Sequence, residues 1–115
     1  MLMSGLRLKS GLVEAELMAV LRDKHGLMGF NYPIMLGLLD AAMTRSPAGL
    51  RGSGLHEVAE ALCDEASIKR YDLQVPHLTS MRSDGLIDDD DRLTDKGRNV
   101  LREMAGSMEP VRATP

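Results

Sequence analysis

The sequence predicts a mainly α-helical domain with one short β-hairpin. Its 115 residues suit one domain, and an apolar share of 43% is normal for a packed core. Apolar residues recur at helical spacing in several segments, and glycine and proline separate these segments. We expect an N-terminal arm or short extended piece over residues 1–11, a single domain over 12–106 and a flexible tail over 107–115.

Three helices are predicted in the first part of the chain. Apolar residues at helical spacing predict the first over residues 12–24. The second is expected over 33–45, because Pro33 suits a first helical turn and the segment has a broad apolar face. A loop rich in glycine and serine follows, with Ser53 as a candidate cap for the third helix over 55–66.

The second part of the chain predicts a short helix, a hairpin and a last helix. Pro76 suits the first turn of a helix over 76–84. Apolar residues then flank a charged stretch, which predicts a hairpin over 86–93. Thr94 is a good N-cap for a helix over 95–105.

Composition excludes several classes of function. Aromatic residues make up only 3% of the chain, which argues against binding single strands by base stacking. The single cysteine, Cys63, excludes a disulfide framework, and the three histidines lack ligand spacing, so no metal or cofactor is expected. No apolar run reaches the ~18 residues of a membrane span. No catalytic motif is present, and we expect a cytoplasmic protein that is not an enzyme.

One block of sequence carries a family resemblance. Residues 75–101 read VPHLTSMRSDGLIDDDDRLTDKGRNVL. An apolar pair, Leu78 and Met81, precedes Gly-Leu-Ile at 85–87, and Leu-Thr-Asp-Lys-Gly follows at 93–97. This pattern resembles the second half of a winged helix-turn-helix domain. It is most similar to the PadR-like transcriptional regulators.

The resemblance implies a winged helix-turn-helix fold with an extra N-terminal helix and a winged core over about residues 33–104. It implies sequence-specific binding of double-stranded DNA by a transcriptional regulator, with repression as the expected effect. Helix 76–84 would enter the major groove as part of a homodimer. With Val75, Leu78 and Met81 taken as inward, we expect base contacts from His77, Thr79 and Ser80, and phosphate contacts from Lys69, Arg70, Arg82, Lys96 and Arg98.

The homodimer needs an apolar surface outside the winged core. The first helix supplies one, and the last helix has its own apolar face. We therefore predict that dimerisation buries Val13, Leu17, Leu21, Leu101 and Met104.

Charge favours an alternative function. The net charge is −3, and residues 57–115 carry eight Lys and Arg against thirteen Asp and Glu. The expected hairpin has four aspartates, at 88–91, which would repel a phosphate backbone. The alternative is an acidic winged-helix module that binds a protein partner and inhibits or adapts a nucleic-acid machine.

Overall fold

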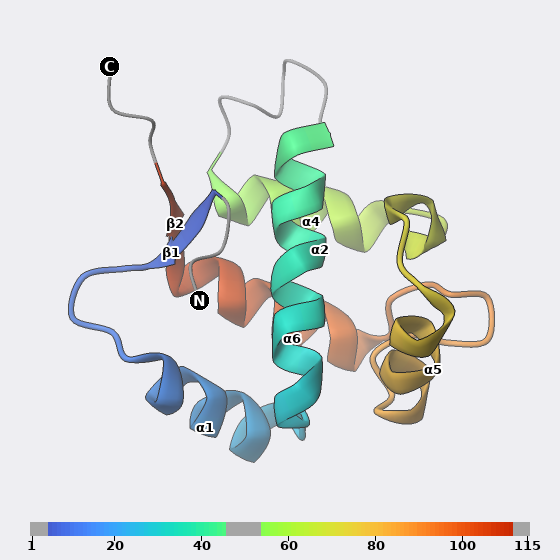
Figure 1. Ribbon diagram of the computed structural model, residues 1–115, viewed down its shortest axis with the longest axis horizontal. Helices are drawn as coiled ribbons and strands as arrows, with labels where there is room; N and C mark the ends of the chain where they lie inside the picture. The colour runs from blue at the N-terminus through green and yellow to red at the C-terminus, as the bar shows by residue number, and fades with distance from the viewer. Residues whose placement is uncertain (1–4, 46–53, 112–115) are drawn as a thin grey trace.

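The computed structural model describes residues 5–45 and 54–111 (Figure 1). This part of the chain is mainly helical and contains a two-stranded antiparallel sheet. In chain order the elements are β1 (Leu6–Leu8), α1 (Glu14–His25), the 3-10 turn η1 (Gly29–Asn31), α2 (Tyr32–Arg45), α4 (Leu55–Asp64), the 3-10 turn η2 (Ile68–Tyr71), α5 (Val75–Ser83), α6 (Asp95–Gly106) and β2 (Met108–Pro110). The predicted mainly helical class is confirmed.

The core lies where α2 crosses α4 and α6 (Figure 1). α2 is the most apolar of these helices, and its buried residues include Met35, Leu38 and Leu39. α6 buries one stripe, formed by Val100, Leu101 and Met104, and leaves its charged face in solvent. The molecule is therefore two layers of helices, with α2 packed across the other two.

A close backbone approach fixes the start of α6. A Cβ atom on Gly97 would lie 2.2 Å from the carbonyl oxygen of Leu86, a distance that no side chain tolerates. The Thr94 backbone N–H donates to the same carbonyl oxygen, and the Thr94 side chain accepts a hydrogen bond from the Gly97 N–H. Thr94 is thus the N-cap, as predicted. Gly97 is required because the backbone of Leu86 lies against it.

The predicted hairpin is present in a very short form. Ile87 and Leu93 form one antiparallel bridge. Gly85 has a φ of +77°, which lets the chain leave α5 abruptly, as the sequence predicts. The hairpin therefore directly joins the end of α5 to the start of α6.

The chain end after Gly106 corrects one prediction. The tail was expected to be flexible, but Met108–Pro110 pairs with Leu6–Leu8 in antiparallel register. Leu6 and Met108 are both buried against the core, and an Arg7–Glu109 ion pair of 2.6 Å crosses the two strands. Burial of these two apolar side chains orders both segments, and the expected extended piece near the N-terminus is β1.

Helix boundaries differ from the expected ones by one or two residues. α1 begins at Glu14 rather than residue 12, and α4 ends at Asp64. η1 occupies part of the expected break before α2. Gly54, and not the predicted Ser53, is the N-cap of α4. The rest of the expected loop, residues 46–53, lies outside the described residues.

None of the described helices is long and apolar enough to cross a membrane.

Candidate functional site

α5 presents an open face at one end of the molecule (Figure 1). Of its nine residues, Leu78 and Met81 are buried, as predicted. Val75 is 74% exposed, although its spacing from Leu78 placed it on the inward face. Val75 is the first residue of α5, and this first turn extends past the core. The expectation that Val75 packs inward was wrong.

The open face of α5 is defined here as Val75, Pro76, Thr79, Arg82 and Ser83, which are all exposed. Thr79 was predicted on the flank of the helix, and it is exposed. His77, the other predicted base contact on this helix, is half-buried.

A polar network holds α5 against the rest of the chain. The buried Asn31 of η1 donates from Nδ2 to Asp84 Oδ2 at 3.0 Å and accepts from Ser80 Oγ at 2.6 Å. Asp84 Oδ2 also accepts from the Met28 N–H at 3.1 Å. Lys96 Nζ donates to the Asp84 and Gly26 carbonyl oxygens at 2.5 and 3.2 Å. We call Asn31, Ser80, Asp84 and Lys96 the anchoring network.

The anchoring network corrects two predicted contacts. Ser80 was expected to face outward, but its hydroxyl is turned to Asn31. Lys96 was expected to meet a phosphate, but its ammonium already donates to two carbonyl oxygens and lies 3.5 Å from Asp84 Oδ1. The partners Asn31 and Gly26 are distant in sequence, so helical spacing gives no sign of these bonds.

Two of the predicted phosphate contacts precede α5, in η2. Lys69 is exposed, and its side chain has no ion-pair partner among the described residues. Arg70 pairs with Glu65 at 2.9 Å, and its guanidinium lies 5.8 Å from the centre of the Tyr71 ring. Arg45 donates to the Arg70 carbonyl oxygen at 2.7 Å and thereby holds this turn.

The other two predicted cations have carboxylate partners. Arg82 pairs with Asp91 of the hairpin at 2.5 Å, which ties α5 to the hairpin. Arg98 pairs with Asp95 at 3.3 Å within the first turn of α6. Both are partly exposed.

The four aspartates of the hairpin have different roles. Asp88 Oδ1 accepts from the backbone N–H groups of Asp90 and Arg92, and the Arg92 N–H is the largest cause that lowers the Asp88 pKa. Asp91 has a φ of 61° and pairs with Arg82. Asp89 and Asp90 remain as exposed carboxylates without a cation partner in the described chain.

The sequence analysis missed Arg92. It follows the four aspartates and is exposed, and its side chain has no ion-pair partner among residues 5–45 and 54–111. Its place in the hairpin puts a free guanidinium on the same element that Arg82 contacts. Because Arg92 directly follows four aspartates, the sequence analysis did not single it out as a candidate contact.

The predicted dimer residues need correction. Leu17, Leu21, Leu101 and Met104 are buried within a single chain, where α1 packs on α6. Only Val13 of the five is exposed. Four of these side chains are already in the core and cannot form an interface without opening it.

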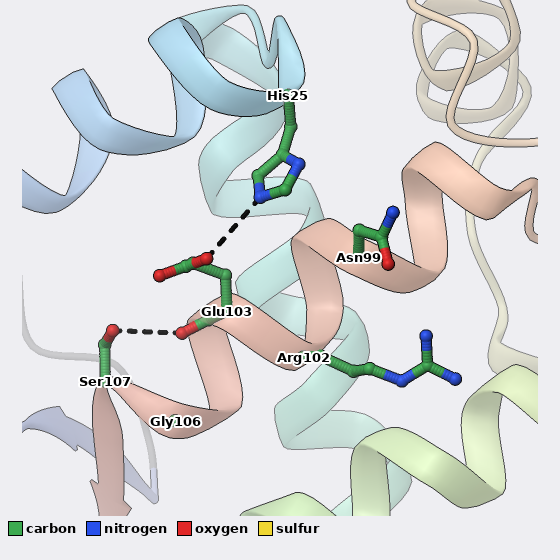
Figure 2. A pocket seen from close by; sticks show the side chains of 6 residues that line it. All are labelled: His25, Asn99, Arg102, Glu103, Gly106 and Ser107. Carbon is green, nitrogen blue, oxygen red and sulfur yellow. Dashed lines mark hydrogen bonds and ion pairs between the residues drawn. The ribbon is translucent and has the colours of Figure 1, made fainter.

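A polar hollow of about 430 Å³ lies between α1 and α6 (Figure 2). His25 Nε2 lies 3.5 Å from Glu103, and Ser107 Oγ donates to the Glu103 carbonyl oxygen at 2.9 Å. Arg102 extends toward α4, where its Nε donates to Glu60 at 2.7 Å; this bond lowers the Glu60 pKa and raises that of Arg102. The charged groups around the hollow already have partners in the chain.

Cys63 is buried in α4, and burial raises the pKa of its thiol. Residues 5–45 and 54–111 bring together no group of three or more His, Cys, Asp or Glu side chains that could hold a metal ion.

Comparisons of this chain with models of known protein families, with curated proteins and with solved structures found no match. Its function must therefore be inferred from the chemistry of α5 and the residues around it.

Proposed function

We propose that the chain is a winged helix-turn-helix regulator of transcription that binds double-stranded DNA as a homodimer, with α5 in the major groove. One observation carries this proposal. α5 is fixed in direction by the anchoring network, yet its whole outer face is exposed and bears small groups and one cation. A rigid helix with such a face suits base-edge readout.

The order of elements supports the proposal. α4 and α5 are consecutive helices, the hairpin follows at once, and α6 closes against it. The Ile68 N–H of η2 donates to the Asp91 carbonyl oxygen at 3.0 Å, so the connector between the two helices lies against the hairpin. A wing beside a recognition helix is the arrangement of winged domains.

The residue types on the open face suit DNA. Val75 offers methyl groups to a thymine methyl, and the hydroxyls of Thr79 and Ser83 can bond to either kind of base edge. Lys69 and Arg92 extend from the two elements that Asp91 links, and each is free to meet a phosphate. We propose that Val75, Thr79 and Ser83 contact base edges and that Lys69 and Arg92 contact phosphates. Arg70, Arg82 and Arg98 are proposed as further phosphate contacts.

The acidic hairpin opposes DNA less than its sequence indicates. Asp91 is paired with Arg82, so one of the four charges is balanced within the chain. Asp88, Asp89 and Asp90 remain as exposed carboxylates, and the exposed Arg92 follows them in the hairpin. Exposed ion pairs such as Arg70–Glu65 contribute less than about 1 kcal/mol, so a phosphate can displace the carboxylate.

The direct test is selection of a binding sequence from a pool of random duplexes. Fluorescence anisotropy then compares the selected duplex with a scrambled one over a range of salt concentrations. We expect Lys69→Ala and Arg92→Ala to weaken binding to both duplexes and to lower the salt slope by about one each. Thr79→Ala should weaken only the selected duplex, by about tenfold.

Lys9→Ala is the matched control, because Lys9 is an exposed lysine that directly follows β1. β1 and α5 lie on opposite sides of the molecule (Figure 1). The Lys9 variant should bind like the wild type. Absence of salt-sensitive binding to any duplex at low salt would contradict the proposal.

A second candidate function rests on a different observation. Met28 and Phe30 are 51% and 60% exposed at η1, next to the anchoring network. Exposed aromatic and methionine side chains are typical of protein interfaces. A module that binds a protein would lose its partner in the Phe30→Ser variant, whereas DNA binding would be unchanged.

A further inference from the structure

Gln74, at the start of α5, has a side chain that no contact within the chain explains. Its carbonyl oxygen accepts the Leu78 N–H at 3.1 Å, so its backbone is fixed as the N-cap of the helix, but its side chain makes no capping hydrogen bond. Glutamine is not among the residue types that cap helices well. The side chain is exposed, and its amide has no hydrogen-bond partner among residues 5–45 and 54–111. Gln74 therefore offers a free donor and a free acceptor next to the open face of α5.

Val75 follows this amide and has a different chemistry. Its side chain is 74% exposed, more than any other large apolar side chain of the described chain. Gln74 and Val75 thus place an amide and a pair of methyl groups at consecutive positions. In the major groove an A·T pair presents the N7 acceptor and the N6 donor of adenine together with the 5-methyl group of thymine. An amide and an apolar side chain match these groups.

The start of α5 lacks the side chain that reads guanine. Guanine presents two acceptors in the major groove, which arginine or lysine contacts. Arg82 is the cation of the open face, and it lies two turns from Val75, about 10 Å along the helix axis. It is also held by Asp91 of the hairpin. The side chains at the start of the helix therefore favour A·T over G·C.

We infer that Gln74 and Val75 together read one A·T base pair in each half-site of the DNA. The Gln74 amide donates to adenine N7 and accepts from the adenine N6 amino group, and the Val75 methyl groups contact the thymine methyl. The inference rests on the proposed function and deepens it, because it names the base pair that the start of α5 selects and adds Gln74 to the contacts.

The surroundings of these two residues support duplex DNA as the occupant. The elements before and after α5 each expose a cation without an ion-pair partner in the described chain, Lys69 in η2 and Arg92 in the hairpin. Two phosphate contacts of this kind fix the register of a helix on the duplex. In helix-turn-helix domains the residues at the N-terminal end of the recognition helix contact base edges. Gln74 and Val75 are at that end.

The experiment combines base analogues with protein variants on the selected duplex. A 7-deazaadenine base lacks the N7 acceptor and a uracil base lacks the methyl group of thymine, while both keep their Watson–Crick pairing. Each A·T pair is replaced singly, and fluorescence anisotropy measures the Kd. We expect one A·T pair in each half-site at which 7-deazaadenine weakens binding about tenfold and uracil about threefold.

The variants assign each sensitivity to one side chain. Gln74→Ala should lose the sensitivity to 7-deazaadenine at that pair and keep the sensitivity to uracil, whereas Val75→Ala should do the reverse. Ser83→Ala is the matched control, because Ser83 is on the same open face two turns away, and it should keep both sensitivities at this pair. A merely structural role of Gln74 or Val75 would weaken binding to every duplex by the same factor.

The outcomes separate this inference from the proposed function. Binding of a selected duplex in which no A·T pair responds to either analogue would overturn the inference and leave the proposed function in place. The same holds if Gln74→Ala and Val75→Ala retain both sensitivities. A wild type that binds no duplex at low salt would overturn both.

Discussion

α1 and α5 are alike in how little of them is buried and different in what they leave uncovered. Each helix buries two side chains, Leu17 and Leu21 in α1 and Leu78 and Met81 in α5. The uncovered side chains at α1, Leu12, Val13 and Val20, are aliphatic. The open face of α5 also carries hydroxyl groups and a cation. Equal burial thus accompanies two kinds of surface, one aliphatic and one largely polar.

The two helices are also held differently. α1 packs through leucines onto α6 and meets the hydrogen bonds of Lys96 only at its C-cap, Gly26. α5 is oriented along its side by Asn31 and at its end by Asp84. Apolar packing tolerates small displacements, but hydrogen bonds have strict geometry. A helix that reads base edges needs the stricter fixation.

The largest expected effect comes from a substitution in α6, where its first turn packs on the segment that follows α5. Gly97→Ala places a Cβ against the Leu86 carbonyl oxygen and should lower the free energy of unfolding by about 3 kcal/mol. Gly37→Ala is the matched control, because nothing lies within 4 Å of its Cβ position in α2. It should raise the free energy of unfolding by up to about 1 kcal/mol. Urea titration measures the unfolding free energy of both variants. Equal effects of the two substitutions would show that the close approach does not exist.

The anchoring network gives the next largest effect. Asn31→Ala removes the buried partner of Ser80 and Asp84 and should cost about 2 kcal/mol of unfolding free energy. Asn99→Ala, at an exposed position of α6, should cost almost nothing. Hydrogen exchange should show faster opening of α5 than of α1 in the Asn31 variant. An equal increase in the exchange rates of α1 and α5 would contradict the view that Asn31 holds α5 in particular.

Alkaline pH tests the burial of Tyr32, the first residue of α2. Burial, and then the charge of Glu14, raises the pKa of Tyr32 to about 12 from 10.0. The folded state therefore holds the phenol proton more tightly than the unfolded state, and stability is lost as pH rises from 10 toward 12. The loss attributable to Tyr32 should reach about 2 kcal/mol at pH 12.

Tyr32→Phe isolates this loss, because the buried hydroxyl has no hydrogen-bond partner among the described residues. The difference in unfolding free energy between wild type and variant should be constant below pH 10 and should change above it. A constant difference up to pH 12 would exclude the proposed burial of the phenol.

The smallest expected effect concerns the hairpin beside α5. Hydrogen bonds from backbone N–H groups, that of Arg92 first, lower the pKa of Asp88 from 3.8. The carboxylate therefore stabilises the fold above about pH 4, and this contribution is lost as pH falls through the lowered pKa. Wild type should exceed Asp88→Asn slightly in stability at neutral pH and equal it in strong acid. Asp89→Asn should match the wild type, because no hydrogen bond is made to Asp89 in the described chain.

Local signals predicted most of the fold. Gly85 and Thr94 act through neighbours within a few residues, so their turn and cap are readable from the sequence. β1 was expected only as an arm or a short extended piece. β2 and its pairing with β1 join the two ends of the described chain, so no local pattern revealed them. Gly97 was visible as part of a motif, but its physical reason, contact with Leu86, needs the structure.

The candidate site was predicted in part. Helical spacing correctly turned Leu78 and Met81 inward and Ser83 outward, because all three lie within the regular turns of α5. It failed for Val75 at the helix start and for Ser80, whose partner Asn31 comes from a separate element. Charge counting overstated the acidity of the hairpin, since Asp91 is paired with Arg82 of α5.

Thiol labelling at two positions tests the contrast between α1 and α5 most directly. The Thr79→Cys and Val20→Cys variants each place one exposed thiol in a chain whose own Cys63 is buried. The selected duplex should slow labelling at position 79 and leave position 20 unchanged. A bound duplex that leaves position 79 as reactive as in the free protein would contradict the account.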